Sequence, residues 1–261
     1  MAQQPIRFDD GDAYEHGMGV WSHLAGQIFL DWLAPKSGLR WIDVGCGNGA
    51  FTELLVRRCA PAEIQGIDPS EAQLAFARAR TGVGASTFLL GDAMALPFDG
   101  ARFDAAVMAL VIHFVPDPVK GVAEMARVVS PGGTVAAYVW DYFDDGSPSA
   151  PVQAELLAVG VTPRHPPSAG ATHIATLRDL WIDAGLEAVE AREIAVRRTF
   201  VDFEDFWRAT TAMPNIGTPI AAMAADDIEQ LQARLRVRLP ADVSGRIECQ
   251  ARANAVKGRV P

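Results

Sequence analysis

The sequence predicts an α/β fold in which a doubly wound, mostly parallel sheet lies between two layers of helices. In the first half of the chain, short β-branched or apolar runs alternate with helix-like stretches, which is the pattern of βαβ units. Residues 103–113 form a long apolar run, as expected for a central strand that is buried on both faces. A glycine-rich turn, residues 45–49, follows the first of these runs. A parallel sheet with a ligand site at the carboxyl ends of its strands accounts for all three observations.

The elements of the first half can be placed in order from their caps and breaks. Residues 22–33 carry apolar side chains at helical spacing, and Ser22 stands where the N-cap of this helix is expected. Ser70 is placed to cap a second helix, and the Ser-Pro-Gly-Gly segment at residues 130–133 ends a third. Strands are expected over residues 41–44, 63–67, 86–90, 103–113 and 134–140, and helices over residues 51–58, 69–80 and 118–129.

After residue 140 the regular alternation ends. Residues 144–170 are rich in Pro, Gly and Ala and predict a lid over the top edge of the sheet, although a plain surface excursion fits equally well. Beyond it the patterns predict a helix over 176–184, a strand over 189–196, helices over 200–213 and 225–239 separated by 214–219, and a strand over 247–256. We expect one domain over residues 1–261, with a core over 10–141 and cap insertions over 144–170 and 200–240.

The composition argues against several classes of function. A formal net charge of −9 without any block of Lys and Arg argues against nucleic-acid binding. The three cysteines are Cys46, Cys59 and Cys249, and their spacing predicts neither a disulfide framework nor a metal site. The longest apolar run is far shorter than the roughly 20 residues of a spanning helix, and no signal segment is visible. We therefore expect a cytoplasmic protein that acts on a small molecule, without a membrane partner.

The strongest chemical signal is the segment at residues 43–49, Asp-Val-Gly-Cys-Gly-Asn-Gly, between a strand and a helix. Glycines permit positive φ in a tight turn and let a ligand approach the backbone. The spacing differs from the dinucleotide pattern Gly-x-Gly-x-x-Gly, in which a pyrophosphate rests on the helix amides. Asp43 stands two residues before the turn, where a carboxylate repels a pyrophosphate and suits a ligand that carries an ammonium group. The turn therefore disfavours a nicotinamide-dependent dehydrogenase.

This segment resembles the first motif of the class I S-adenosylmethionine-dependent methyltransferases, an acidic and an aliphatic residue followed by Gly-x-Gly-x-Gly. Residues 66–70 (Gly-Ile-Asp-Pro-Ser), 91–98 (Gly-Asp-Ala-Met-Ala-Leu-Pro-Phe), 103–104 (Phe-Asp) and 127–133 (Arg-Val-Val-Ser-Pro-Gly-Gly) resemble later motifs in the same order. The likeness covers roughly residues 10–141 and is greatest to the small-molecule branch, methyltransferase type 11, which includes quinone-biosynthesis enzymes. It implies a Rossmann-like sheet of seven strands, the last one antiparallel, with a helical cap.

The resemblance also implies a site for S-adenosylmethionine, and for its product S-adenosylhomocysteine, at the strand ends. In that site Asp43 would bind the methionine ammonium directly or through water, and Asp68 would accept hydrogen bonds from both ribose hydroxyls. Asp92 would accept a hydrogen bond from the adenine amino group. The full set of expected cofactor residues is Asp43, Gly45, Cys46, Gly47, Asp68, Pro69, Asp92, Ala93, Met94, Leu110 and Val111.

A second set of residues is expected on the acceptor side of the methyl group. His113, at the carboxyl end of the fourth expected strand, is the best-placed base for an oxygen or carbon acceptor, although a histidine that only closes a strand also fits. The segment 14–22 resembles the lead-in helix of the same branch, with Val20 where related sequences often carry a basic residue. The expected acceptor-pocket residues are Tyr14, Trp21, Trp140, Tyr142 and Trp207, with core packing as the alternative.

Together these features predict transfer of a methyl group from S-adenosylmethionine to a small, apolar or neutral acceptor. A non-catalytic protein that binds S-adenosylmethionine or S-adenosylhomocysteine is the alternative. A closed, acceptor-sized pocket that faces the sulfonium would distinguish the enzyme from such a binding protein. The methylated atom, the acceptor and the oligomeric state, monomer or homodimer, stay open at this stage.

Overall fold

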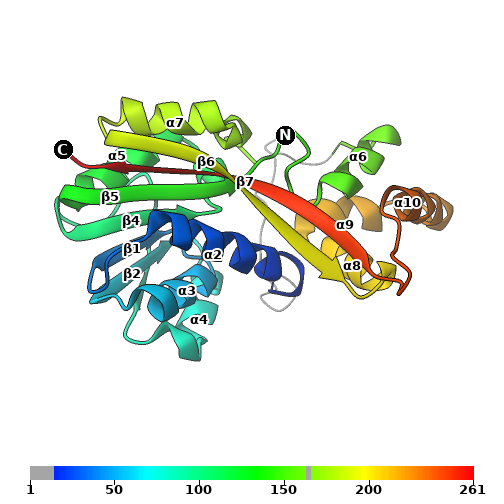
Figure 1. Cartoon of the computed structure of the whole chain (residues 1–261), viewed down its shortest axis with the longest axis horizontal. Coiled ribbons are helices and arrows are strands. Elements are labelled where there is room, and N and C mark those ends of the chain that lie inside the picture. The colour runs from blue at the N-terminus through cyan, green and yellow to red at the C-terminus, as the bar shows by residue number, and fades with distance from the viewer. Residues whose placement is uncertain (1–14, 163–165) are drawn as a thin grey trace.

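The computed structural model describes residues 15–162 and 166–261, which form one seven-stranded sheet with helices on both faces (Figure 1). The strand order is β3-β2-β1-β4-β5-β7-β6, and every pair is parallel except the two that β7 makes. The strands are β1 (Arg40–Val44), β2 (Glu63–Asp68), β3 (Thr87–Leu90), β4 (Phe103–Ala109), β5 (Val129–Trp140), β6 (Glu187–Phe200) and β7 (Ile247–Arg259). The predicted doubly wound sheet with an antiparallel last strand is thereby confirmed.

Two layers of helices enclose the sheet, as Figure 1 shows. One face is covered by α2 (Val20–Leu33), α3 (Ala50–Cys59) and α4 (Glu71–Ala79), and the other by α5 (Pro118–Val128) and α7 (Ile174–Asp183). Leu54 and Leu55 bury the inner side of α3, while Val122 and Met125 do the same for α5. Burial of apolar side chains on both faces explains why the central strands read as continuous apolar runs.

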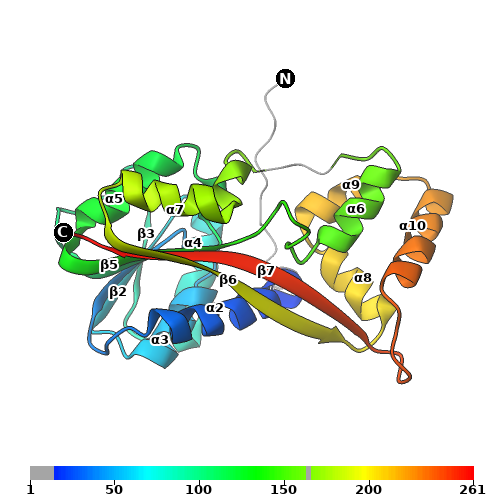
Figure 2. The ribbon, with the colours of Figure 1, turned by 45° about the horizontal axis from the view of Figure 1, so that its top comes forward.

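The two longest strands extend beyond the rest of the sheet. Together β6 and β7 run toward a group of helices at one end of the molecule, which Figures 1 and 2 both show. This group consists of α6 (Ala150–Ala158), α8 (Phe203–Thr211), α9 (Pro214–Ala221) and α10 (Ala225–Arg238). Glu155 joins α6 to α10 through ion pairs of 3.0 Å with Arg234 and Arg238. That these helices cap an acceptor stays a prediction.

One departure from the predicted elements is at the end of β4. The strand stops at Ala109 and not at His113, so the predicted boundary is wrong. Leu110 has a φ of 63°, in the left-handed region, which turns the chain out of the sheet. A short 3₁₀ turn then carries His113.

The short helical turns of the described chain are η1 (Glu15–Gly19), η2 (Thr81–Val83), η3 (Ile112–Phe114) and η4 (Ala169–Thr172).

Three helix starts show where the sequence-based predictions agree with the structure and where they do not. Ser70 caps α4 and accepts a hydrogen bond from the Gln73 amide at 3.4 Å, as predicted. Ser22 is not an N-cap, because α2 begins earlier and the Ser22 hydroxyl donates to the Met18 carbonyl at 2.9 Å. The predicted break at residues 214–219 is instead helix α9, which begins with Pro214, since proline fits the first turn of a helix.

The chain reverses its direction of travel across the sheet between β1 and β4. From β1 it continues to β2 and β3 on one side, whereas β4 and β5 lie on the other. In such sheets the crevice at the carboxyl ends of the two central strands is the usual ligand site. The glycine turn after β1 and the Leu110–Val111 segment after β4 both lie at this edge.

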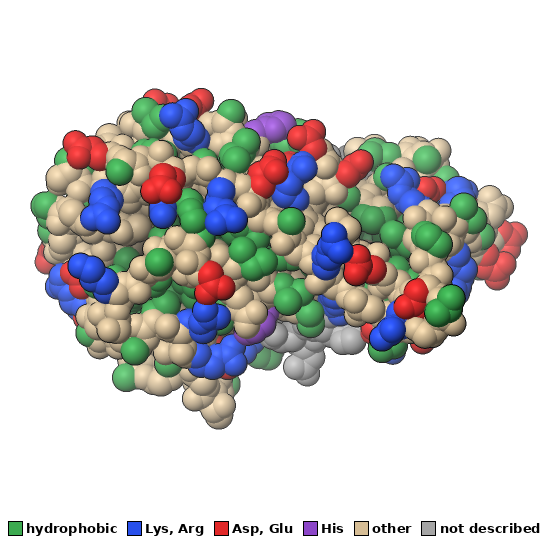
Figure 3. Space-filling model, viewed as in Figure 1, with side chains coloured by type: hydrophobic (Ala, Val, Ile, Leu, Met, Phe, Trp, Pro, Cys, Tyr) green, Lys and Arg blue, Asp and Glu red, His purple; other side chains and the backbone are tan. Residues whose placement is uncertain are grey.

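The surface of the protein does not point to a specific partner. On the face seen in Figure 3, basic and acidic side chains are interspersed, so this face carries no broad basic patch. Within residues 15–162 and 166–261, no helix is long and apolar enough to cross a membrane. The same described residues contain no group of His, Cys, Asp or Glu side chains that could hold a metal ion.

Candidate active site

The glycine turn after β1 packs directly against the segment that leaves β4. Gly45, Gly47 and Gly49 have φ values of 75°, 52° and 80°, all in the left-handed region. A Cβ atom on Gly45 would lie 2.4 Å from a methyl carbon of Val111, which is too close for any side chain. Glycine at position 45 is therefore required both by the backbone conformation and by the close approach of the two strand exits.

Asp43 is completely enclosed at the carboxyl end of β1. Its Oδ2 atom accepts a hydrogen bond from the Thr52 hydroxyl of α3 at 2.7 Å, and its buried Oδ1 atom has no hydrogen-bond partner in the described chain. Burial raises the pKa of Asp43 to about 7, and the nearby charge of Asp68 adds to the rise although the Thr52 bond opposes it. The carboxyl group thus retains one acceptor oxygen that nothing in the described part of the chain satisfies.

Asp68 ends the neighbouring strand β2 and closes the glycine turn. Its two carboxylate oxygens each accept one backbone amide at 2.9 Å, from Gly47 and from Ser70. Burial raises the pKa of Asp68, and the two amides offset part of that rise. An ionised carboxylate has about four lone-pair positions, so each oxygen can accept a further donor from a ligand.

Asp92 follows β3 at the same edge of the sheet. The amide of Gly91 donates to the Asp68 carbonyl at 3.1 Å, which places the Asp92 turn beside the end of β2. The Asp92 carboxylate is exposed and accepts the Met94 amide at 2.8 Å. Ala93 and Met94 are half-buried against the core on the α5 side of the sheet. The structure therefore brings the three predicted acids to adjacent strand ends.

Three further predicted cofactor residues, Leu110, Cys46 and Pro69, differ in conformation and burial. Leu110 holds its left-handed conformation while its amide donates to the Tyr138 carbonyl at 2.8 Å. The Cys46 thiol is buried near Gly66, and its amide donates to the Ile67 carbonyl at 3.0 Å. Burial also raises the pKa of this thiol. Pro69 is exposed.

His113 lies in η3 with its side chain only 2% exposed. Its Nε2 atom is 3.5 Å from the Tyr142 hydroxyl, and its ring packs 4.0 Å from that of Phe114. The Nδ1 atom is buried and has no hydrogen-bond partner in the described chain. Burial lowers the pKa of His113 to about 3, so the imidazole is neutral at physiological pH. This environment favours a neutral hydrogen-bonding role for His113 over proton uptake.

The predicted acceptor-pocket residues that the structure describes share one apolar cluster. Trp21 and Trp140 meet edge to face at 6.5 Å, and Trp207 stacks on Phe203 at 6.3 Å. Tyr142 packs partly buried against the same cluster, which also contains Leu110 at the end of β4. The cluster therefore connects the cofactor side to the helices α8, α9 and α10. Tyr14 lies outside the described residues.

Two residues that were not predicted from the sequence form hydrogen bonds to Asp43 and to the glycine turn. Thr52 fixes Asp43, and Arg80 donates to the Asn48 carbonyl of the glycine turn at 2.7 Å. Thr52 lies in the first turn of the helix after the motif, nine positions from its partner. That position is a weak signal, because many helices carry a threonine there for other reasons.

Part of the chain, including the glycine turn and Asp68, matches known sequences. Residues 42–137 match the family described as "Methyltransferase domain". An uncharacterized methyltransferase of Mycobacterium tuberculosis is 35% identical over 133 residues, which are 51% of this chain and 51% of that protein. Demethylmenaquinone methyltransferase of Staphylococcus aureus is 33% identical over 129 residues, which are 49% of this chain and 52% of that protein. The chain spans about half the length of the relatives it matches.

Comparison with solved structures covers nearly the whole chain. A chain from the complex between the Trm112 methyltransferase activator and a methyltransferase of Haloferax volcanii superposes with a TM-score of 0.63 at 22% identity, covering 99% of this chain and 100% of that one. A methyltransferase structure from Bacillus halodurans gives a TM-score of 0.57 at 20% identity, covering 90% and 98%. At these identities the likeness shows the fold alone. Residues 42–137 therefore match a methyltransferase domain, and the fold of the chain is similar to that of methyltransferase structures.

Proposed function

We propose that this chain transfers a methyl group from S-adenosylmethionine to a small, apolar or neutral acceptor. The observation that carries the proposal is the pair of buried acids at neighbouring strand ends. Asp43 keeps one unsatisfied oxygen, and Asp68 has lone pairs beyond those that two amides use. These acceptors fit a ligand with an ammonium group at one end and two adjacent hydroxyls further along.

The chain's own residues would bind and orient both partners in this reaction. Asp43, Asp68 and Asp92 would hold the amino-acid tail, the sugar and the base of the cofactor, while the glycine turn leaves room beside the backbone. The bound cofactor supplies a strongly electrophilic methyl group on its sulfonium. The protein's main task is then to align the acceptor with that methyl group and to exclude water.

The residues expected to line the acceptor pocket favour an apolar, ring-shaped acceptor. The apolar cluster contains or borders four uncharged side chains, Trp21, Trp140, Tyr142 and Trp207. A charged acceptor would have to give up its hydration against these rings, at a large cost in free energy. One relative is named demethylmenaquinone methyltransferase, so a quinol is the first acceptor to test.

A non-catalytic protein that binds the same cofactor is the second candidate. The observation that favours it is the enclosure of His113, whose side chain is only 2% exposed. Without a base, an oxygen or carbon acceptor could not lose its proton readily. Cofactor binding without turnover of any acceptor would select this second candidate.

Calorimetry with S-adenosylhomocysteine tests the cofactor site directly. We expect the parent protein to bind S-adenosylhomocysteine and not NAD. Asp68→Ala should lose one or two hydrogen bonds to a charged group, about 1.5–3 kcal/mol each, and should raise the Kd by about tenfold or more. Asp31→Ala, which changes an acid on the exposed surface, is the matched control and should leave the Kd unchanged. Equal affinity of the Asp68→Ala variant and the parent would contradict the proposed ribose site.

Turnover is tested with labelled cofactor and a panel of acceptors. The panel should pair a demethylated quinol with a phosphorylated amine, an acidic peptide and a short RNA. We expect methyl incorporation into the apolar quinol or into another neutral ring compound. Transfer only to the peptide or the RNA would contradict the proposed acceptor class.

A further inference from the structure

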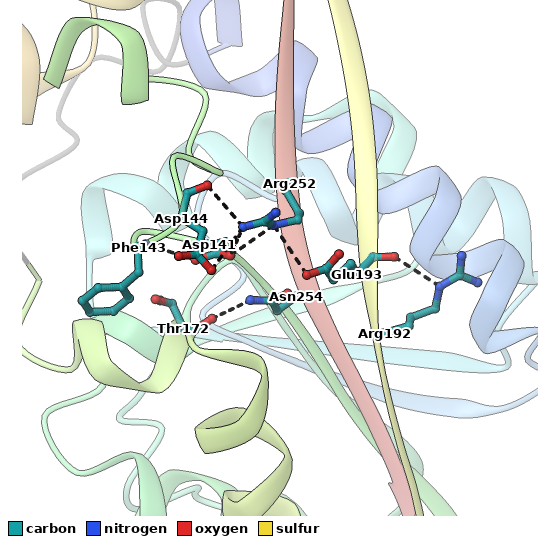
Figure 4. A network of polar contacts seen from close by, with 8 residues as sticks. All are labelled: Asp141, Phe143, Asp144, Thr172, Arg192, Glu193, Arg252 and Asn254. Atoms are coloured by element: carbon teal, nitrogen blue, oxygen red, sulfur yellow. Dashed lines mark hydrogen bonds and ion pairs between the residues drawn. The ribbon is translucent and has the colours of Figure 1, made fainter. Parts of the chain in front are cut away.

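Arg252, on β7, holds the start of the segment that leaves β5 (Figure 4). Its Nε and Nη2 atoms donate to Oδ2 of Asp141 at 3.1 and 2.7 Å, and Nη2 also donates to the Asp144 carbonyl at 3.2 Å. The other Asp141 oxygen accepts the Phe143 amide at 3.0 Å. The Asp141 side chain is only 5% exposed. Asp141 is therefore used inside the protein, although it leaves the sheet at the edge where acceptors are expected.

Asn254 holds the other end of the same segment. It lies two residues after Arg252 on the same face of β7, and its side-chain amide donates to the Thr172 carbonyl at 2.8 Å (Figure 4). The side chains of Asn254 and Thr172 are buried, and the Thr172 hydroxyl donates to the Ala169 carbonyl at 2.8 Å, which closes η4. One face of one strand therefore fixes both ends of the chain between residues 141 and 172.

The two anchored ends converge on one side-chain contact. Tyr142 directly follows Asp141, and its hydroxyl lies 3.5 Å from the Nε2 atom of His113. From the other end, the Ser168 amide just before η4 donates to the His113 carbonyl at 3.0 Å, and the Ser168 hydroxyl donates to the Val115 carbonyl at 2.7 Å. One route thus fixes Tyr142, and the other fixes the turn that carries His113.

We infer that Arg252 and Asn254 are positioning residues of the acceptor side, which set the contact between Tyr142 and His113 from one face of β7. The inference rests on the proposed function, because it takes Tyr142 and His113 as part of the acceptor side. Neither anchor touches the reacting atoms. Since the imidazole of His113 is buried and neutral, its place depends on this scaffold and not on an ion pair of its own.

Amide hydrogen exchange and NMR of the His113 ring nitrogens test the two anchors separately. Arg252→Met should speed exchange over residues 141–149 by about tenfold or more, because it removes charge-assisted hydrogen bonds from that turn. Asn254→Leu, which keeps the size and loses the donor, should do the same over residues 168–173. Both variants should shift the His113 ring signals in the direction that Tyr142→Phe shifts them.

A matched control and a milder variant guard against a general loss of structure. Arg197→Met removes an exposed ion pair with Glu248 between β6 and β7 and should change neither exchange nor the ring signals. Arg252→Lys keeps the charge but cannot form the forked contact with Asp141, and should give a smaller change in the same direction. If Arg252→Met does not fold, Arg252→Lys decides the matter. Unaltered His113 signals in Arg252→Lys and Asn254→Leu would overturn the inference.

Two further readouts separate this inference from the proposed function. The Kd for S-adenosylhomocysteine should stay within about threefold of the parent value in both anchor variants, since neither touches the predicted cofactor residues. With any acceptor that the turnover panel identifies, the KM for the acceptor should rise while the KM for S-adenosylmethionine stays unchanged. Loss of cofactor affinity in the anchor variants would contradict the inference, whereas failure of the parent to bind S-adenosylhomocysteine would contradict the proposed function.

Discussion

Asp43 shows how burial turns an ordinary acid into a group that responds to pH near neutrality. The side chain is fully enclosed, and its pKa rises to about 7 because the ionised form is poorly solvated there. A ligand ammonium nearby would stabilise the ionised form and lower that pKa again. Cofactor binding and ionisation of Asp43 should therefore be linked.

The linkage predicts a pH-dependent affinity for S-adenosylhomocysteine. Below pH 7 the free protein carries a protonated Asp43, which must lose its proton before it can stabilise the ammonium. With a pKa of about 7 in the free protein, the Kd should be about tenfold higher at pH 6 than at pH 8. Calorimetry at the two pH values measures the change, and Asp43→Asn should abolish the dependence. A Kd that is the same at both pH values in the parent would contradict a charge interaction at Asp43.

The positions of the predicted acids could be inferred from the sequence better than the environments of Asp141 and His113. The motif order predicts which acids lie at the strand ends, because the carboxyl ends of parallel strands share one edge of a sheet. It could not predict that Asp141 pairs with Arg252, since the two residues are 111 positions apart and no spacing rule connects them. It also could not predict that His113 is enclosed, because a histidine after an apolar run is equally compatible with an open site.

At the scale of single elements, regular strands and helices could be predicted from the sequence. The irregular end of a strand and a helix that contains prolines could not. The caps and periodicity predict β1, β2, α3 and α5 to within one or two residues. The end of β4 was misplaced because the left-handed conformation of Leu110 leaves no mark in an apolar run. Helix α9 was missed because its two prolines are typical of a break. Pro214 is compatible with the first turn of a helix, whereas Pro219 lies inside α9, a position that proline usually disfavours.

The glycine turn offers a test at this scale, because two of its glycines differ in their surroundings. Gly45→Ala and Gly47→Ala should each lose about 1 kcal/mol or more of stability from the left-handed conformation. Gly45→Ala should lose about 1–3 kcal/mol more, since its Cβ would lie 2.4 Å from Val111, whereas a Cβ at Gly47 would make only an ordinary contact at 3.8 Å with the Gln73 side chain. Denaturant unfolding measures both free energies, and Val111→Ala should restore part of the loss at Gly45. Equal losses in the two glycine variants would contradict the close packing of the strand exits.

At the scale of the whole molecule, the β6–β7 pair links two parts for which we propose different tasks. The sheet carries the predicted cofactor residues, while helices α6, α8, α9 and α10 lie at the far end of the long strands (Figure 2). Apolar packing and the Glu155 ion pairs hold these helices together. We therefore expect changes at the cap to affect acceptor binding and stability more than cofactor binding.

Glu155→Gln tests that division of tasks. The side chain of Glu155 is 12% exposed and pairs with two arginines that are each more than one-third exposed, so its loss should cost about 1 kcal/mol of unfolding free energy. The Kd for S-adenosylhomocysteine should not change. Glu204→Gln, which removes the exposed partner of Arg236 between α8 and α10, is the matched control and should cost less. A large change in cofactor affinity in Glu155→Gln would contradict the separation of cap and cofactor site.

A crystal structure with S-adenosylhomocysteine bound would test the central claim most directly. Both ribose hydroxyls should lie within hydrogen-bond distance of the Asp68 carboxylate, with the amino group toward Asp43 and the base beside Asp92. A ligand bound elsewhere, or one whose sugar lies away from Asp68 at the end of β2, would contradict it.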